Sequence, residues 1–233
     1  MARAPVSTRL VTGHAVYTGL LGGSFNPAHP GHRRISKFAL DALALDEVWW
    51  LVSPGNPLKP AAGMAPLAAR LASASRMARG TRIRATAVER DLHTRYTVDT
   101  LRALIRRYPN RRFLWLMGAD NLAQFHRWRA WRMIARMVPI AVIARPGHDS
   151  RAVFSPAMRW LGPYRTSVTR LRNRIGWQAP ALVMLRFDPD TRSATAVRLK
   201  HPNWADAYVD VQALDGVTRR VIGGSGVLRK TKG

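Results

Sequence analysis

Short apolar runs alternate along the chain with segments whose apolar residues recur at helical spacing, and no other feature restricts the fold as strongly. The predicted strands are 17–21, 48–52, 83–88, 113–117, 140–144 and 182–185. The predicted helical segments are 35–43, 67–74, 98–105 and 122–137. Strands that alternate with helices form parallel sheets through right-handed crossovers. The sequence therefore predicts an α/β fold: a single doubly wound, Rossmann-like domain with a parallel sheet.

The length of the chain favours one such domain with two extensions. A chain of 233 residues, 47% of them hydrophobic, suits one α/β domain better than two. We expect the domain at 17–200, after a flexible extension at 1–16 and before a C-terminal extension at 201–233. The basic end of this second extension, residues 218–233, is expected to be disordered. The first residues lack an apolar segment of signal-peptide or membrane-span length, so we expect no membrane partner.

Composition excludes several kinds of chemistry. The chain contains no cysteine, which excludes disulfides, thiolate zinc sites and cysteine nucleophiles and favours a cytoplasmic location. Its formal charge of +25, from 38 Lys and Arg against 13 Asp and Glu, suits a polyanionic partner. That partner could be a nucleic acid or a polyphosphate substrate. Because the arginines are spread along the whole chain, we favour the enzyme with a polyphosphate substrate over the nucleic-acid-binding protein.

The loop after the first predicted strand is the most unusual part of the sequence, and ligands bind beyond the carboxyl ends of strands in such sheets. It reads GGSFNPAHPGH, residues 22–32. Gly22 and Gly23 let the backbone approach a ligand, and His29 and His32 flank the start of the next helix. The two imidazoles could donate to phosphate oxygens and place fixed positive charge against a triphosphate. A His pair alone is more often structural or a fortuitous metal site.

The complete string resembles the signature of the nucleotidyltransferase superfamily with HxGH motifs, whose members transfer nucleoside monophosphate groups from nucleoside triphosphates. The resemblance implies that His29 and His32 are catalytic and stabilise the transition state. It also implies ATP binding by Gly22, Gly23, Ser24, Phe25, His29 and His32.

Two later loops also place polar residues near strand ends. SPGNPLKP, residues 53–60, contains Lys59 as a candidate phosphate contact, although Pro and Gly make it a plain turn equally well. RYTVDTL, residues 95–101, precedes a helix that Thr97 could cap, and Tyr96 could lie over the site. Both segments resemble the nicotinate mononucleotide adenylyltransferases, in which YTxDTL borders the pyridine pocket.

The segment after the fourth predicted strand, GADNLAQFHRW, offers a carboxylate and an aromatic ring. Asp120 could accept hydrogen bonds from ribose hydroxyls or could cap the next helix. Trp128 could belong to the core, but polar His126 and Arg127 beside it favour a ligand contact. In the family that the chain resembles, GxD meets the sugar and the following Trp stacks on the pyridine ring. The RPG at 145–147 also resembles the family and is interpreted as architectural.

SATAVR, residues 193–198, is a second candidate phosphate segment. Ser193 and Thr195 can offer hydroxyls and amides at a helix start, with Arg198 one turn inside. The segment resembles the family's SxTxxR motif, which implies that these three residues grip the β and γ phosphates of ATP and that Arg198 is catalytic. Arg192 replaces the apolar residue that is usual before the motif, and Pro202 should interrupt the helix.

These motifs occur in order over about residues 17–200, and the resemblance to the nicotinate mononucleotide adenylyltransferases implies a complete reaction of NAD biosynthesis. A phosphate oxygen of nicotinate mononucleotide attacks the α phosphorus of ATP, and Mg²⁺ bridges the phosphates. Pyrophosphate departs, and nicotinate adenine dinucleotide is the product. The implied nicotinate mononucleotide-binding residues are Asn26, Lys59, Tyr96, Thr97, Asp120 and Trp128. Nicotinamide mononucleotide, phosphopantetheine and a cytidylyl acceptor remain rival substrates. The oligomeric state stays open, a homo-oligomer included.

Overall fold

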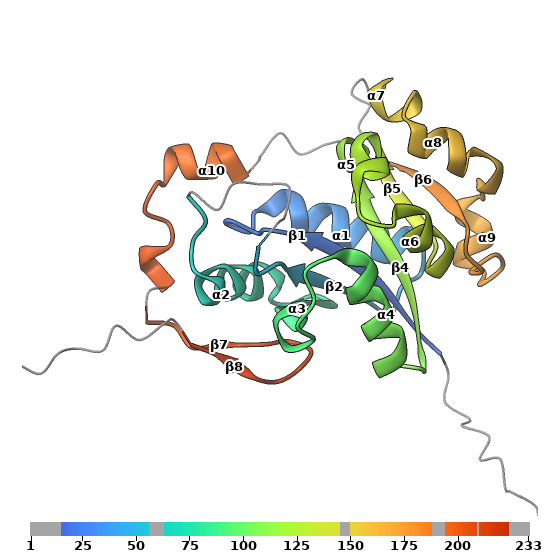
Figure 1. Cartoon of the computed structure of the whole chain (residues 1–233). Helices are drawn as coiled ribbons and strands as arrows, with labels where there is room; N and C mark the ends of the chain where they lie inside the picture. The colour runs from blue at the N-terminus through green and yellow to red at the C-terminus, as the bar shows by residue number, and fades with distance from the viewer. Residues whose placement is uncertain (1–14, 56–62, 145–149, 188–193, 209, 224–233) are drawn as a thin grey trace, which may run out of the picture.

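A sheet of six parallel strands forms the centre of the computed structural model, which describes residues 15–55, 63–144, 150–187, 194–208 and 210–223 (Figure 1). The strands are β1 (Val16–Gly23), β2 (Glu47–Val52), β3 (Ile83–Thr86), β4 (Arg111–Gly118), β5 (Ile140–Ala144) and β6 (Leu182–Arg186). They lie in the order β3-β2-β1-β4-β5-β6, and all neighbours pair in parallel. The predicted doubly wound α/β fold is confirmed.

The strand order reverses between β1 and β4. The chain builds the sheet from β1 through β2 to β3 at one edge, then returns to place β4 on the other side of β1. In a doubly wound sheet this reversal separates the loops that follow β1 and β4 and leaves a crevice at their carboxyl ends. The loop that begins at Gly22 and the segment that begins at Gly118 therefore lie on neighbouring strands.

Side chains of the central strands alternate between two apolar cores, one on each face of the sheet. Leu21 and Trp50 face the first core and Leu20 and Trp49 the second. Helices α1 (Pro30–Ala42), α2 (Leu67–Ala78) and α9 (Val168–Arg172) cover the first core. The second core lies under α3 (Val88–Asp91), α4 (Thr97–Arg107), α5 (Ala119–Gln124), α6 (Trp131–Met137), α7 (Ser150–Val153) and α8 (Pro156–Leu161), the last followed by η2 (Gly162–Tyr164). No helix in the described ranges combines the length and apolarity needed to cross a bilayer.

Two predicted elements differ from the structure. The predicted helical stretch 122–137 is divided into α5, η1 (Phe125–Arg127) and α6, because Trp128 has extended backbone and Ala130 is left-handed at φ 49°. The predicted strand 83–88 ends at Thr86. There the Thr86 hydroxyl accepts a hydrogen bond from the Val88 N–H at 3.1 Å, which turns the chain into α3.

The C-terminal part of the chain returns to the edge of the sheet. Helix α10 (Ala194–Lys200) ends before Pro202, as predicted, and η3 (Asp206–Tyr208) leads to an antiparallel pair, β7 (Ala213–Leu214) and β8 (Val221–Ile222). The hairpin docks on β3 because the Gly216 N–H donates to the Ala85 carbonyl at 2.9 Å, where a Cβ on Gly216 would lie only 2.9 Å from that oxygen. The expectation of disorder is therefore wrong for 218–223, and residues 224–233 lie outside the described residues.

Buried Asp215 holds this hairpin in place. Its Oδ2 accepts hydrogen bonds from the Thr86 hydroxyl at 3.0 Å and the Ala87 N–H at 2.7 Å. Its Oδ1 accepts from the N–H groups of Val217 and Thr218, both at 2.8 Å. The side chain is fully buried, so one carboxylate joins the turn of the hairpin to the end of β3.

Candidate active site

The carboxyl end of β1 has little room for side chains. A Cβ on Gly22 would lie 3.0 Å from the Trp115 ring, and one on Gly23 would lie 3.2 Å from the Phe25 ring. Both distances are shorter than ordinary van der Waals contact. The packing of the neighbouring rings thus requires glycine at both positions.

His29 and His32 lie together at the start of α1. His29 is the N-cap, the ring centroids are 3.8 Å apart, and the backbone N–H of His29 donates to Nδ1 of His32 at 3.2 Å. Burial, together with the neighbouring His29, lowers the pKa of His32 to about 3. The expectation of fixed positive charge is therefore wrong for His32. Since Nδ1 accepts a hydrogen bond, the proton of the neutral ring lies on Nε2, which can donate to a ligand.

Phe25 has a structural role in the same loop. Its ring is 1% exposed and packs against Trp50 and His32, with centroid distances of 5.1 and 4.7 Å. The backbone of Phe25 is left-handed, at φ 46°. The ring thus supports His32 from the core and is not available for contact with ATP.

Asn26 connects this loop with two other segments. Its Nδ2 donates to the Gly63 carbonyl at 2.8 Å, and its Oδ1 accepts from the Ala65 N–H at 3.2 Å. Its backbone carbonyl accepts a hydrogen bond from Nη1 of Arg198 at 2.6 Å. The side chain of Asn26 is buried and satisfied by the protein, so it orders the loop.

The Arg198 contact brings the two predicted phosphate segments together. Arg198 lies on α10 and also donates to the hydroxyl of Thr195 at 3.2 Å, which fixes its guanidinium beside the first loop. Figure 1 shows α10 beyond the carboxyl end of β1, on the side of α1 and α2. Ser193 and Lys59 lie outside the described residues, as does the RPG segment.

The other predicted ligand residues lie around the second core. Tyr96 is the N-cap of α4 without a side-chain cap bond, and Thr97 is the first helical residue, so the capping role expected for Thr97 is wrong. The N-cap of α5 is Gly118, which also excludes capping by Asp120 and leaves that carboxylate exposed. The guanidinium of Arg129 lies over the Tyr96 ring, 4.7 Å from its centroid.

Trp128 is half-buried and packs against the second core. One part of its ring packs edge-on against Trp115 and Phe125, at centroid distances of 6.0 and 5.3 Å. The rest is accessible. Trp115 in turn packs against Gly22 on β1, so this ring connects Trp128 with the first residues of the histidine loop.

Two buried charged residues of this region were not predicted from the sequence. Arg70 lies 1% exposed on α2, and Glu89 lies buried on α3. Burial raises the pKa of Glu89 to about 7, while hydrogen bonds from Thr100 and Ser53 oppose the shift. A signal existed for Arg70, because it falls on the helical stripe of Leu67, Leu71 and Ala74, where an exposed charge is not expected. The sequence holds no comparable signal for Glu89.

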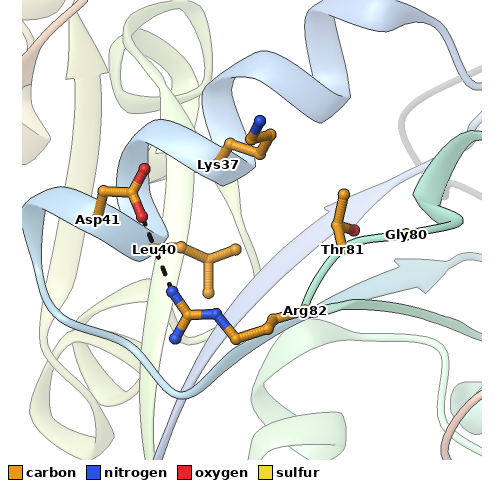
Figure 2. Close-up of a pocket in the computed structure, with 6 residues that line it drawn as sticks. All are labelled: Lys37, Leu40, Asp41, Gly80, Thr81 and Arg82. Carbon is orange, nitrogen blue, oxygen red and sulfur yellow. Dashed lines mark ion pairs between the residues drawn. The ribbon is translucent and has the colours of Figure 1, made fainter.

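The cavity drawn in Figure 2 does not coincide with this site. Its volume is about 370 Å³, and it is lined by Lys37, Leu40, Asp41, Gly80, Thr81 and Arg82. Arg82 directly precedes β3, so the cavity lies at the amino ends of the strands, opposite the motif loops. Figure 2 shows Arg82 turned towards Asp41, with which it forms an ion pair at 3.8 Å. The candidate active site is assigned to the carboxyl ends of β1 and β4, where the motif loops lie.

A parallel sheet with an HxGH loop on β1 and an SxTxxR helix bonded to that loop defines a nucleotidyltransferase. Residues 20–199 match the family described as cytidylyltransferase-like, so the chain belongs to this class. Within it, the chain is 65% identical to a protein of Erythrobacter litoralis over 90% of this chain and 95% of that protein. A protein of Parvibaculum lavamentivorans is 53% identical over 77% of this chain and 90% of its own length. Both carry the name "probable nicotinate-nucleotide adenylyltransferase", and the chain belongs to the nicotinate-nucleotide adenylyltransferase family, as the motifs predicted.

A solved structure supports the fold independently. The Plasmodium falciparum nicotinic acid mononucleotide adenylyltransferase complexed with NaAD has a TM-score of 0.58 to this chain at 15% identity. The similarity covers 79% of this chain and 83% of that structure. At this identity the match concerns the arrangement of strands and helices.

Proposed function

We propose that the crevice between β1 and β4 is where the chain performs the reaction of its family. The chain transfers the adenylyl group of ATP to nicotinate mononucleotide, which gives nicotinate adenine dinucleotide and pyrophosphate in NAD biosynthesis. The observation that carries the site assignment is the 2.6 Å hydrogen bond from Arg198 to the Asn26 carbonyl. It places the cation of α10 next to the histidine loop, where a triphosphate can contact both.

ATP binds along the first loop and α10 in this proposal. The backbone of Gly22, Gly23, Ser24 and Phe25 approaches the nucleotide, and His29 and His32 donate to its phosphates. Neutral His32 donates through Nε2–H, since its Nδ1 is occupied by the His29 N–H. Arg198 supplies permanent positive charge, and Thr195 adds a hydroxyl from the same helix. The resemblance of the motif assigns a second hydroxyl contact to Ser193.

Nicotinate mononucleotide binds on the other side of the crevice. The exposed carboxylate of Asp120 accepts from ribose hydroxyls, and the accessible part of Trp128 stacks on the pyridine ring. Tyr96 and Thr97 border the pyridine, and Lys59 contacts a phosphate. Asn26 acts through the loop that it holds, because its side-chain atoms already bond Gly63 and Ala65.

Positioning and charge neutralisation are the chemistry that these residues can supply. The attacking phosphate of nicotinate mononucleotide is already anionic, so the reaction needs no protein nucleophile or strong general base. Within the described ranges, no three His, Asp or Glu residues form a metal-binding group. Mg²⁺ would enter with ATP, would be held mostly by phosphate oxygens and water, and would neutralise developing negative charge. The absence of cysteine is the support for a cytoplasmic location.

The proposal is tested by pyrophosphate release from ATP and Mg²⁺ with three acceptors at equal concentration: nicotinate mononucleotide, nicotinamide mononucleotide and phosphopantetheine. Preference for the nicotinate form is expected. Preference for another acceptor would retain the phosphate-site roles and overturn the assignment of the pyridine side. Release with none of the three would refute the proposed function.

A further inference from the structure

One buried guanidinium joins the loops that follow β1 and β2. Arg70 donates from Nη1 to the carbonyls of Ser24 at 2.8 Å and Ser53 at 2.6 Å. Its Nη2 donates to the Pro54 carbonyl at 3.3 Å, and its Nε to the Ala65 carbonyl at 2.8 Å. Every one of these acceptors is a backbone carbonyl. Among the residues that the structure describes, no carboxylate forms an ion pair with Arg70.

The network extends from Arg70 to the proposed ATP site. Ala65, whose carbonyl Arg70 holds, donates its N–H to the Asn26 side chain at 3.2 Å, and the Asn26 carbonyl accepts from Arg198 at 2.6 Å. Ser24 lies in the loop that also carries His29 and His32. A single side chain of α2 thus bonds both this loop and the loop after β2, beside the hydrogen bond from the Ser53 N–H to the Gly23 carbonyl at 3.0 Å.

Only arginine has the geometry for this position. Its planar fork carries five N–H donors, which here reach carbonyls in three separate segments, whereas a lysine ammonium presents its donors from one point. Burial lowers the pKa of Arg70 to about 10, so the group stays charged near neutral pH. Burial of this charge without a carboxylate partner costs desolvation free energy, and an apolar side chain could fill the same position without that cost. Stability alone therefore does not explain an arginine here.

We infer that Arg70 is a positioning residue for adenylyl transfer. It touches neither substrate and fixes the spacing between the histidine loop after β1 and the loop after β2. The inference rests on the proposed function, because it assumes that ATP binds the histidine loop, which Arg70 holds at Ser24. A misplacement of reacting groups by about 1 Å can lower a rate by about a hundredfold, so the spacing of the two loops controls kcat.

The test compares Arg70→Lys and Arg70→Ala with Arg76→Ala, a control on the exposed face of the same helix. Folded fraction and melting temperature are measured by circular dichroism, and kcat and KM by pyrophosphate release. We expect Arg70→Lys to fold and to lose about tenfold to a hundredfold in kcat per folded molecule. Arg76→Ala should stay within about twofold of the wild type. Millimolar guanidinium should restore part of the kcat of Arg70→Ala, and equal concentrations of ammonium or urea should not.

A merely structural role gives different results. Unchanged kcat per folded molecule in Arg70→Lys, or failure of both Arg70 variants to fold, would overturn the inference and make Arg70 a stability residue. Restoration of Arg70→Ala by urea as well as guanidinium would also overturn it. The wild-type enzyme, assayed beside the variants, separates the two proposals, because its lack of turnover would refute the proposed function whatever the variants do.

Discussion

Replacement of His32 by alanine should affect catalysis far more than folding. Loss of one preorganised donor to the charge of a transition state costs about 10² to 10³ in kcat, or about 3–4 kcal/mol. The folded state loses the acceptor for the His29 N–H, which is worth about 0.5–2 kcal/mol at a helix N-terminus, and part of the contact with Phe25. In a domain of this size, that loss lowers the melting temperature by only a few degrees, at about 2–4 °C per kcal/mol.

His32→Asn is the matched control for this experiment. An asparagine can accept the hydrogen bond of the His29 N–H but cannot place a donor where Nε2–H lies, so its stability should approach the wild-type value while its kcat falls as in His32→Ala. Pyrophosphate release at saturating substrates and thermal melting measure the two quantities. Parallel losses of kcat and melting temperature in both variants, or a kcat of His32→Ala close to the wild-type value, would refute the reasoning.

The stability of the wild type and of His32→Asn should depend differently on pH. Because the folded state lowers the pKa of His32 from 6.5 to about 3, it favours the neutral ring. The resulting stability is fully present above pH 6.5 and is lost as the pH falls towards 3, by up to about 1.4 kcal/mol per pH unit. A fall in pH from 6.5 to 4.5 should therefore lower the free energy of unfolding more in the wild type than in His32→Asn. Denaturation experiments at the two pH values measure this difference.

Three further predictions concern other parts of the site and its support. The folded state raises the pKa of Glu89 from 4.5 to about 7, which gives stability that is present below pH 4.5 and lost as the pH rises through 7. At pH 8 the free energy of unfolding of Glu89→Gln, measured by urea denaturation, should therefore exceed that of the wild type by up to about 3 kcal/mol. A wild-type advantage at that pH would contradict it. Asp215→Ala leaves buried donors without an acceptor and should lower the free energy of unfolding by about 3–5 kcal/mol. The control Asp210→Ala replaces an exposed residue and should change the free energy of unfolding by less than about 0.5 kcal/mol. Similar losses in the two variants would reject this account. Trp128→Ala should raise the KM for nicotinate mononucleotide by about tenfold with little change for ATP, from a stacking energy of about 1.4 kcal/mol. Trp131→Ala, which removes another ring that packs on Phe125, serves as its control, and an equal rise in KM there would assign Trp128 to the core.

The protonation of the site follows from packing that no local pattern describes. The complete string GGSFNPAHPGH predicts a phosphate site, but it gives no indication that His32 is neutral. Its charge depends on the rings of Phe25 and Trp50, which exclude water from one side. Trp50 belongs to β2 and reaches His32 only because β2 pairs with β1. Of these two residues, Arg198 and not His32 therefore brings positive charge to the histidine loop.

Local patterns succeeded where the physical cause is local. Burial on both faces of a parallel sheet requires continuous apolar runs such as 48–52, and these runs identify the strands without tertiary information. The prediction failed at 122–137, where the apolar residues fit one helix but Trp128 and Ala130 leave helical backbone. Phe125, Trp128 and Trp131 pack there as an edge-on cluster, and the geometry of that cluster depends on the sheet beneath it.

The sequence by itself determined the order of strands and helices and the polar residues that follow each strand, because backbone periodicity and glycine or proline turns act over a few residues. Only the tertiary structure decided which of these residues meet. Arg70 bonds a carbonyl 46 residues away, Arg198 one 172 residues away, and Asp215 a hydroxyl 129 residues away. Such contacts, and the burial that shifts the pKa of His32 and Glu89, arise because segments distant in the sequence pack together and exclude water. The spacing of residues along the chain does not predict this packing.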